Sequence, residues 1–141
     1  MKIYFRQIYA QVGCTFPFNS VFQGFLSGKI TDLIKPSSKF INLFGEDYKL
    51  IFNVSAKREL AINEIVGPKV YKKDRDVEHT IFLPYTPIMQ QLEPNKSALE
   101  HLIIGACKIL EDYEIDTSKL KLAQERIIDK IISSPEMFIQ K

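Results

Sequence analysis

Residues 48–54 have the sequence YKLIFNV, and this stretch decides the fold. Large apolar side chains recur there at every second position. Successive side chains of a β-strand point to opposite faces, so this spacing places four of them on one face: Tyr48, Leu50, Phe52 and Val54. We therefore predict a strand over 48–54 with that face against the core.

More strands are predicted on both sides of this one. Residues 2–12 are rich in β-branched and aromatic residues, which favours a strand that ends at Gly13. Residues 59–66 predict another strand, which Gly67-Pro68 would close. Residues 70–72 and 77–83 predict the arms of a hairpin with a charged tip at 73–76. The prolines at 84 and 87 would stop the sheet, since proline has no backbone N–H to donate.

The sequence of residues 14–45 does not decide their secondary structure. A short helix after Pro17 would have Asn19 or Ser20 as its N-cap, and its apolar side would contain Phe22 and Phe25. Residues 35–38 have the composition of a turn.

The last third of the chain is predicted to be helical. Ser97 and Glu100 match a capping box, and apolar residues then recur at three- and four-residue steps to about Tyr113. Only four residues mark a polar side of this helix: His101, Gly105, Lys108 and Asp112. A final helix begins near 116–118 and ends before Pro135. Strands followed by helices predict an α+β fold with a mainly antiparallel sheet and the C-terminal helices packed on one face.

Composition favours one globular domain over residues 1–141, with 45% hydrophobic and 26% charged residues. The net charge is +2, divided as +4, −1 and −1 among residues 1–45, 46–95 and 96–141, so we expect no nucleic-acid partner. The longest nearly apolar stretch, 102–110, is about half a membrane span, and the N-terminus does not resemble a signal peptide. We expect a cytoplasmic protein without a membrane partner, in which Cys14 and Cys107 are reduced thiols.

Residue patterns for catalysis are missing, so we expect a protein that is not an enzyme and needs no cofactor or metal. His79 has the register of the core side of a strand, and a structural role is favoured over a catalytic one. The GFLSG sequence at 24–28 places Ser27 one position too late for a nucleophile elbow. No phosphate-binding loop, dinucleotide fingerprint or zinc-ligand spacing is present.

Two charged segments are the candidates for binding a protein partner. The first is the acidic junction EDYEID at 111–116, in which four carboxylates could meet a basic partner: Glu111, Asp112, Glu114 and Asp116. Tyr113 would supply a rigid anchor there if it is exposed. The second segment is the hairpin tip with Lys73, Asp74 and Arg75. The alternative for the first is a solvated loop with Asp116 as a helix N-cap, and for the second an ordinary solvent-facing turn.

Three segments, NVSA at 53–56, NEIVGP at 63–68 and EHTIFLPY at 78–85, resemble a family of bacterial immunity proteins. These proteins belong to polymorphic-toxin systems, including contact-dependent growth inhibition. The resemblance covers roughly residues 50–86 and implies a small cytoplasmic protein that binds and neutralises one cognate toxin domain, which could be a nuclease. Immunity proteins against nucleases are often strongly acidic, and this chain departs from that with its net charge of +2.

Two other hypotheses remain. One is a small enzyme or ligand-binding domain with an apolar pocket in the N-terminal third, near Phe16, Phe18, Phe22 and Phe25. The other is an adaptor that assembles as a homo-oligomer. The sequence does not indicate the oligomeric state.

Overall fold

The computed structural model describes residues 1–10, 20–57, 65–84 and 96–138. Four strands form one sheet: β1 (Ile3–Ala10), β2 (Lys49–Lys57), β3 (Ile65–Tyr71) and β4 (Asp76–Pro84). The helices are α1 (Ser20–Leu33), α2 (Ser38–Phe44), α3 (Lys96–Asp112), α4 (Ser118–Ile132) and α5 (Pro135–Phe138). The predicted α+β class is therefore confirmed.

The sheet is mixed, so the prediction of a mainly antiparallel sheet is wrong. Its strand order is β1-β2-β4-β3, in which β1 and β2 run parallel, as do β2 and β4. Only the β3–β4 hairpin is antiparallel. A parallel pair needs a long crossover connection, and residues 11–48, which contain α1 and α2, make the one between β1 and β2.

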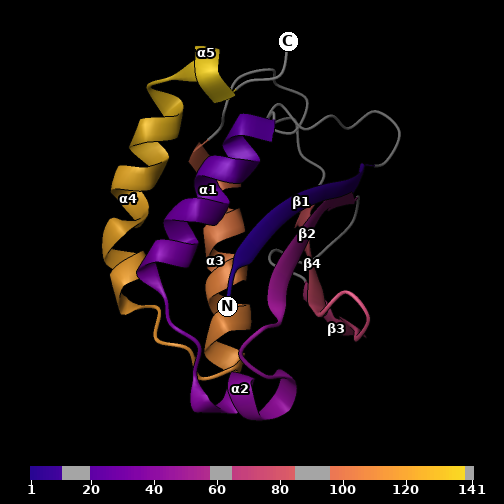
Figure 1. Cartoon of the computed structure of the whole chain (residues 1–141). Coiled ribbons are helices and arrows are strands. Elements are labelled where there is room, and N and C mark those ends of the chain that lie inside the picture. The colour runs from indigo at the N-terminus through magenta and orange to yellow at the C-terminus, as the bar shows by residue number, and fades with distance from the viewer. Residues whose placement is uncertain (11–19, 58–64, 85–95, 139–141) are drawn as a thin grey trace.

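Helices α1, α3 and α4 form two layers on one side of the sheet (Figure 1). Helix α1 packs against β1 and α3 packs against β4, while α4 lies outside them and contacts both α1 and α3. The predicted apolar side of α4 is buried throughout, at Leu120, Ala123, Ile127, Ile128 and Ile131. Helix α2 lies at the end of the sheet where β2 begins.

Strand register decides which side chains meet the helices. Ile3, Leu50 and Val77 are in register across β1, β2 and β4, and all three are buried. The next row on this face contains Phe5, Phe52 and His79. Burial of these rows against α1 and α3 forms one hydrophobic core.

The opposite face of the sheet contains a polar network. Arg6 donates from Nε to Oδ1 of Asn53 at 2.9 Å and pairs with Glu78 at 2.5 Å. Asn53 in turn donates from Nδ2 to Oε1 of Glu78 at 2.6 Å. Asn53 is buried, and these bonds satisfy both ends of its amide.

Helix α1 closes the free edge of β1. Hydroxyls of Ser27 and Thr31 accept hydrogen bonds from the backbone N–H groups of Phe5 (2.8 Å) and Ile3 (3.1 Å). Each hydroxyl also donates to the carbonyl four residues earlier in α1. These N–H groups are therefore occupied and cannot pair with another strand.

Two sequence-based expectations about strand and helix ends need correction. Gly67-Pro68 does not close a strand, because β3 continues to Tyr71 with an irregular register between Val66 and Lys69. An edge strand tolerates proline, since its N–H is not needed by a second neighbour. The part of that predicted strand at 59–64 lies outside the described residues. Helix α2 was not predicted, although Ser37 is its N-cap and accepts from the Phe40 N–H at 3.1 Å.

Candidate functional site

The structure brings the two predicted charged segments to the same end of the molecule, on either side of α2 (Figure 1). On one side, Ser37 donates to the Tyr113 carbonyl (2.5 Å) and Lys39 donates to the Asp112 carbonyl (2.9 Å). On the other side, Arg75 pairs with Asp47 at 3.2 Å, in the turn that follows α2. We call this end the α2-end surface and define it by its exposed residues Leu43, Lys73, Asp74, Arg75, Asp112, Glu114 and Asp116.

The four carboxylates of the acidic junction differ in what they already bind. Glu111 accepts from Thr117 (2.9 Å) and pairs with Lys121 (2.5 Å), and the Lys121 hydrogen bond holds its pKa below the usual value. Asp116 accepts from the backbone N–H (2.9 Å) and the hydroxyl (2.7 Å) of Ser118, and the backbone bond lowers its pKa. These two carboxylates therefore have roles within the fold.

The other two carboxylates are available to a partner. Asp112 and Glu114 are exposed, and neither carboxylate makes a hydrogen bond or ion pair with the described part of the chain. Each can therefore pair with a basic group of a partner without breaking a bond inside this chain.

Both segments contain a charged residue with a left-handed backbone. Among the described residues, the non-glycine positions with positive φ are Arg75 (56°) and Glu114 (60°). Glu114 follows the end of α3, where the Ile115 N–H returns to the Leu110 carbonyl at 3.0 Å, and glycine is the usual residue at such a position. A long charged side chain in this conformation costs backbone energy, and strained positions of this kind concentrate at functional surfaces.

Tyr113 does not provide an exposed anchor, because only 6% of its surface is accessible. Its hydroxyl lies 2.6 Å from Nε2 of His79, and its ring packs edge-on against Phe40 of α2. Burial raises the pKa of Tyr113 to about 12. Tyr113 therefore joins α2, β4 and the acidic junction from inside the core.

An exposed apolar residue of α2 was missed by the sequence reasoning. Leu43 of α2 is 56% exposed, whereas Phe40 on the same helix is fully buried. The signal that could have revealed α2 is Ser37 three residues before Phe40, followed by Gly45 after the helix. An exposed leucine with charged neighbours has the composition of an interface centre with a polar rim.

His79 is buried, as its strand register predicted, with 8% of its surface accessible. Burial lowers its pKa below 6.5, and the charge of Asp112 opposes this shift. A buried imidazole bonded to a buried tyrosine has the contacts of a structural histidine. His101 of α3 is only partly buried.

The pKa of His79 predicts how stability depends on pH. The unfolded chain takes up a proton near pH 6.5, whereas the folded protein resists this protonation, so stability should fall as pH decreases from 7.5 to 5. His79→Gln should reduce that difference. Urea unfolding at both pH values measures it. An unaltered pH difference in His79→Gln would assign the effect to other groups.

The other candidates for chemistry are not assembled into a site in the described residues. Cys107 is buried, and burial raises the pKa of its thiol to about 11, so the reactive thiolate is disfavoured. Cys14 lies outside the described residues. Within the described ranges, no cluster of three His, Cys, Asp or Glu residues could hold a metal ion. None of the described helices is both long enough and apolar enough to cross a membrane.

The structure describes two of the four phenylalanines proposed for an N-terminal pocket, and both belong to α1. Phe22 is buried in the core, while Phe25 lines a groove between α1 and α4. Phe16 and Phe18 lie outside the described residues.

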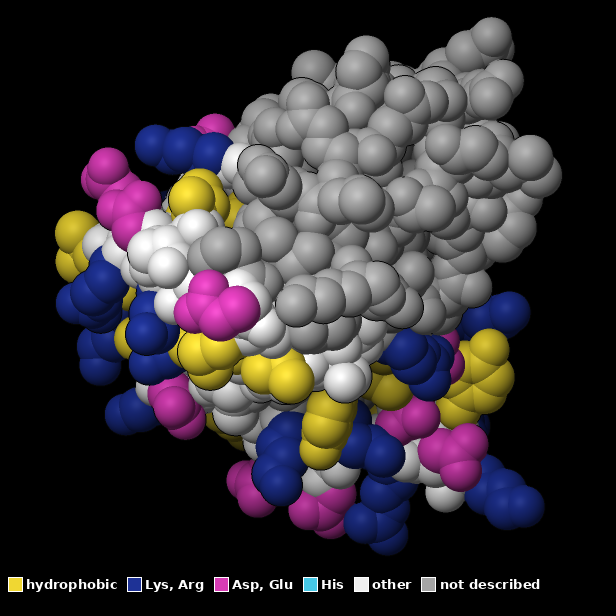
Figure 2. Space-filling view, turned by 90° about the horizontal axis from the view of Figure 1, so that it is seen from above, with side chains coloured by type: hydrophobic (Ala, Val, Ile, Leu, Met, Phe, Trp, Pro, Cys, Tyr) yellow, Lys and Arg dark blue, Asp and Glu magenta, His cyan; other side chains and the backbone are white. Residues whose placement is uncertain are grey.

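Figure 2 views the molecule from above, with α2 on the far side. On the described part of this face, positive and negative side chains are interspersed.

Comparison of the chain with protein-family models, with curated proteins and with solved structures finds no match in any of the three.

Proposed function

We propose that this chain is an immunity protein that binds a cognate bacterial toxin domain at the α2-end surface and neutralises it. The observation that carries the proposal is the convergence of both predicted charged segments on one end of the fold, on either side of helix α2, which contains the exposed Leu43. The resemblance of residues 50–86 to immunity proteins supplies the class of partner. It remains a resemblance, because no family model matches the chain.

The charges of the surface indicate what the toxin contributes. Asp112 and Glu114 are free to pair with lysine or arginine side chains, and Leu43 is suited to a shallow apolar pocket. Lys73, Asp74 and Arg75 add charges of both signs on the other side of α2. The partner surface is therefore expected to be basic where it meets the acidic junction and mixed where it meets the hairpin tip.

The test is a charge reversal at the two free carboxylates. The double variant Asp112→Lys/Glu114→Lys should bind the product of the adjacent upstream gene at least about ten-fold more weakly, with the largest loss at low salt, because exposed interface charges mainly accelerate association. Affinity is measured at two ionic strengths, and protection is measured in cells that express the toxin.

The matched control is Glu125→Lys/Asp129→Lys, which reverses two exposed carboxylates on α4 away from α2. Both double variants should unfold within about 0.5 kcal/mol of the parent protein, since they change surface residues only. If the α2-end variant binds and protects as well as the parent, the interface lies elsewhere. If no neighbouring gene product is bound by the parent, the immunity function itself is wrong.

A further inference from the structure

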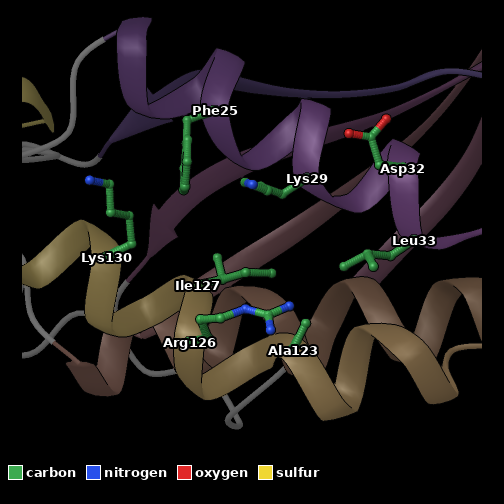
Figure 3. Close-up of a pocket in the computed structure, with 8 residues that line it drawn as sticks. All are labelled: Phe25, Lys29, Asp32, Leu33, Ala123, Arg126, Ile127 and Lys130. Atoms are coloured by element: carbon green, nitrogen blue, oxygen red, sulfur yellow. The ribbon is translucent and has the colours of Figure 1, made fainter.

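A second surface, which shares no residue with the α2-end surface, has the features of a binding site for a small molecule. It is a groove of about 350 Å³ between α1 and α4. Its lining combines an apolar floor, formed by Phe25, Leu33, Ala123 and Ile127, with the charged residues Lys29, Asp32, Arg126 and Lys130. Figure 3 shows the lining side chains between the two helices, except that of Asp32, which points away from α4.

Three cations surround this floor against one carboxylate. Lys29 comes from α1, and its ammonium lies 5.6 Å from the centre of the Phe25 ring. Arg126 and Lys130 come from α4, where their four-residue spacing makes them neighbours of like charge. Among the described residues, none of the three forms an ion pair. Asp32 also lines a second groove, along β1, so its carboxylate does not face the α1–α4 groove alone.

The repulsion among these exposed cations is small, and a bound anion would remove it. Like charges at this spacing repel each other on a helix, and the apolar floor would gain from being removed from water. A ligand that relieves both costs has an anionic head for the cations and an apolar body for the floor. The volume is at the small end of the range for ligand pockets, which favours a small molecule over a polypeptide segment.

We infer that the α1–α4 groove binds a small organic anion with an apolar body, such as a medium-chain carboxylate. The head lies among Lys29, Arg126 and Lys130, and the chain lies along Phe25, Leu33 and Ile127. This site is independent of the α2-end surface, so the two proposals can fail separately.

Decanoate is the probe, and decyltrimethylammonium is the control of opposite charge and equal chain length. Calorimetric titration into the full chain should show saturable binding of one decanoate per protein and no saturable binding of the cation. Lys29→Glu/Arg126→Glu should weaken decanoate binding at least about ten-fold, because charge-assisted hydrogen bonds contribute most to holding the head. Lys119→Glu, an exposed reversal elsewhere on α4, should not weaken it.

The rim residues are exposed, so the double variant should remain folded, and a thermal melt checks this. Leu33→Asp is a second variant, which makes the floor polar and should also abolish binding. Three results would overturn the inference: equal binding of the anion and the cation, equal binding by parent and double variant, or no saturable binding of decanoate.

Discussion

Phe52→Ala should lower the free energy of unfolding by about 3–5 kcal/mol, the range for truncating a buried aromatic side chain. Phe52 lies in the central strand β2 with none of its surface accessible. Its ring is 5.1 Å from the ring of Phe5 on β1, and it is in register with His79 on β4. Truncation leaves a cavity where the sheet meets the helices, and neither neighbouring strand can move to fill it without breaking the sheet.

The measurement is urea unfolding followed by circular dichroism, with the midpoint compared at constant slope. Leu122→Ala is the matched control, because Leu122 is 87% exposed and should change stability by less than about 0.5 kcal/mol. If Phe52→Ala does not fold, Phe52→Leu tests the same position at a smaller cost. Equal midpoints for Phe52→Ala and the parent would show that β2 is not the centre of the core.

The sequence predicted the strand and helix positions that depend on periodicity. The alternation at 48–54 corresponds to β2, and the three- and four-residue steps correspond to the buried sides of α3 and α4. It did not predict the direction of strand pairing. Alternation reports which side of a strand is buried, but parallel and antiparallel neighbours bury the same side chains. The insertion of β4 between β2 and β3 depends on contacts between residues far apart in the chain.

The charged segments of the candidate site could be predicted from the sequence, but the structure around them could not. Composition located residues 73–75 and 111–116 as charged surface segments, and the structure exposes their charged side chains. Tyr113 lies between exposed carboxylates in sequence, yet its side chain continues the buried side of α3 and packs against His79 and Phe40, before the chain turns at Glu114. That turn uses a positive φ at a glutamate, which no sequence rule predicts.

Gly105 of helix α3 is another residue whose surroundings could not be predicted from the sequence. Helical periodicity placed it on the polar side with Lys108, but it is buried, and a Cβ there would lie 2.9 Å from Cγ2 of Ile81. Absence of a side chain brings α3 close to β4. In a hydropathy pattern a glycine interrupts the apolar side of a helix. Here Gly105 is instead the position at which α3 contacts Ile81 of β4.

Gly105→Leu should therefore lower the free energy of unfolding by about 3 kcal/mol, since even its first side-chain carbon has no room beside the fully buried Ile81. The matched control is Gly28→Leu on α1, where no atom lies within 4 Å of the added Cβ. That change should stabilise the protein by up to about 1 kcal/mol, because leucine favours a helix over glycine. Adding Ile81→Ala to Gly105→Leu should cost less than Ile81→Ala alone, since the truncation makes room for the new side chain. Urea unfolding of the single and double variants measures this coupling, and strictly additive effects would show that α3 does not touch β4 at Gly105.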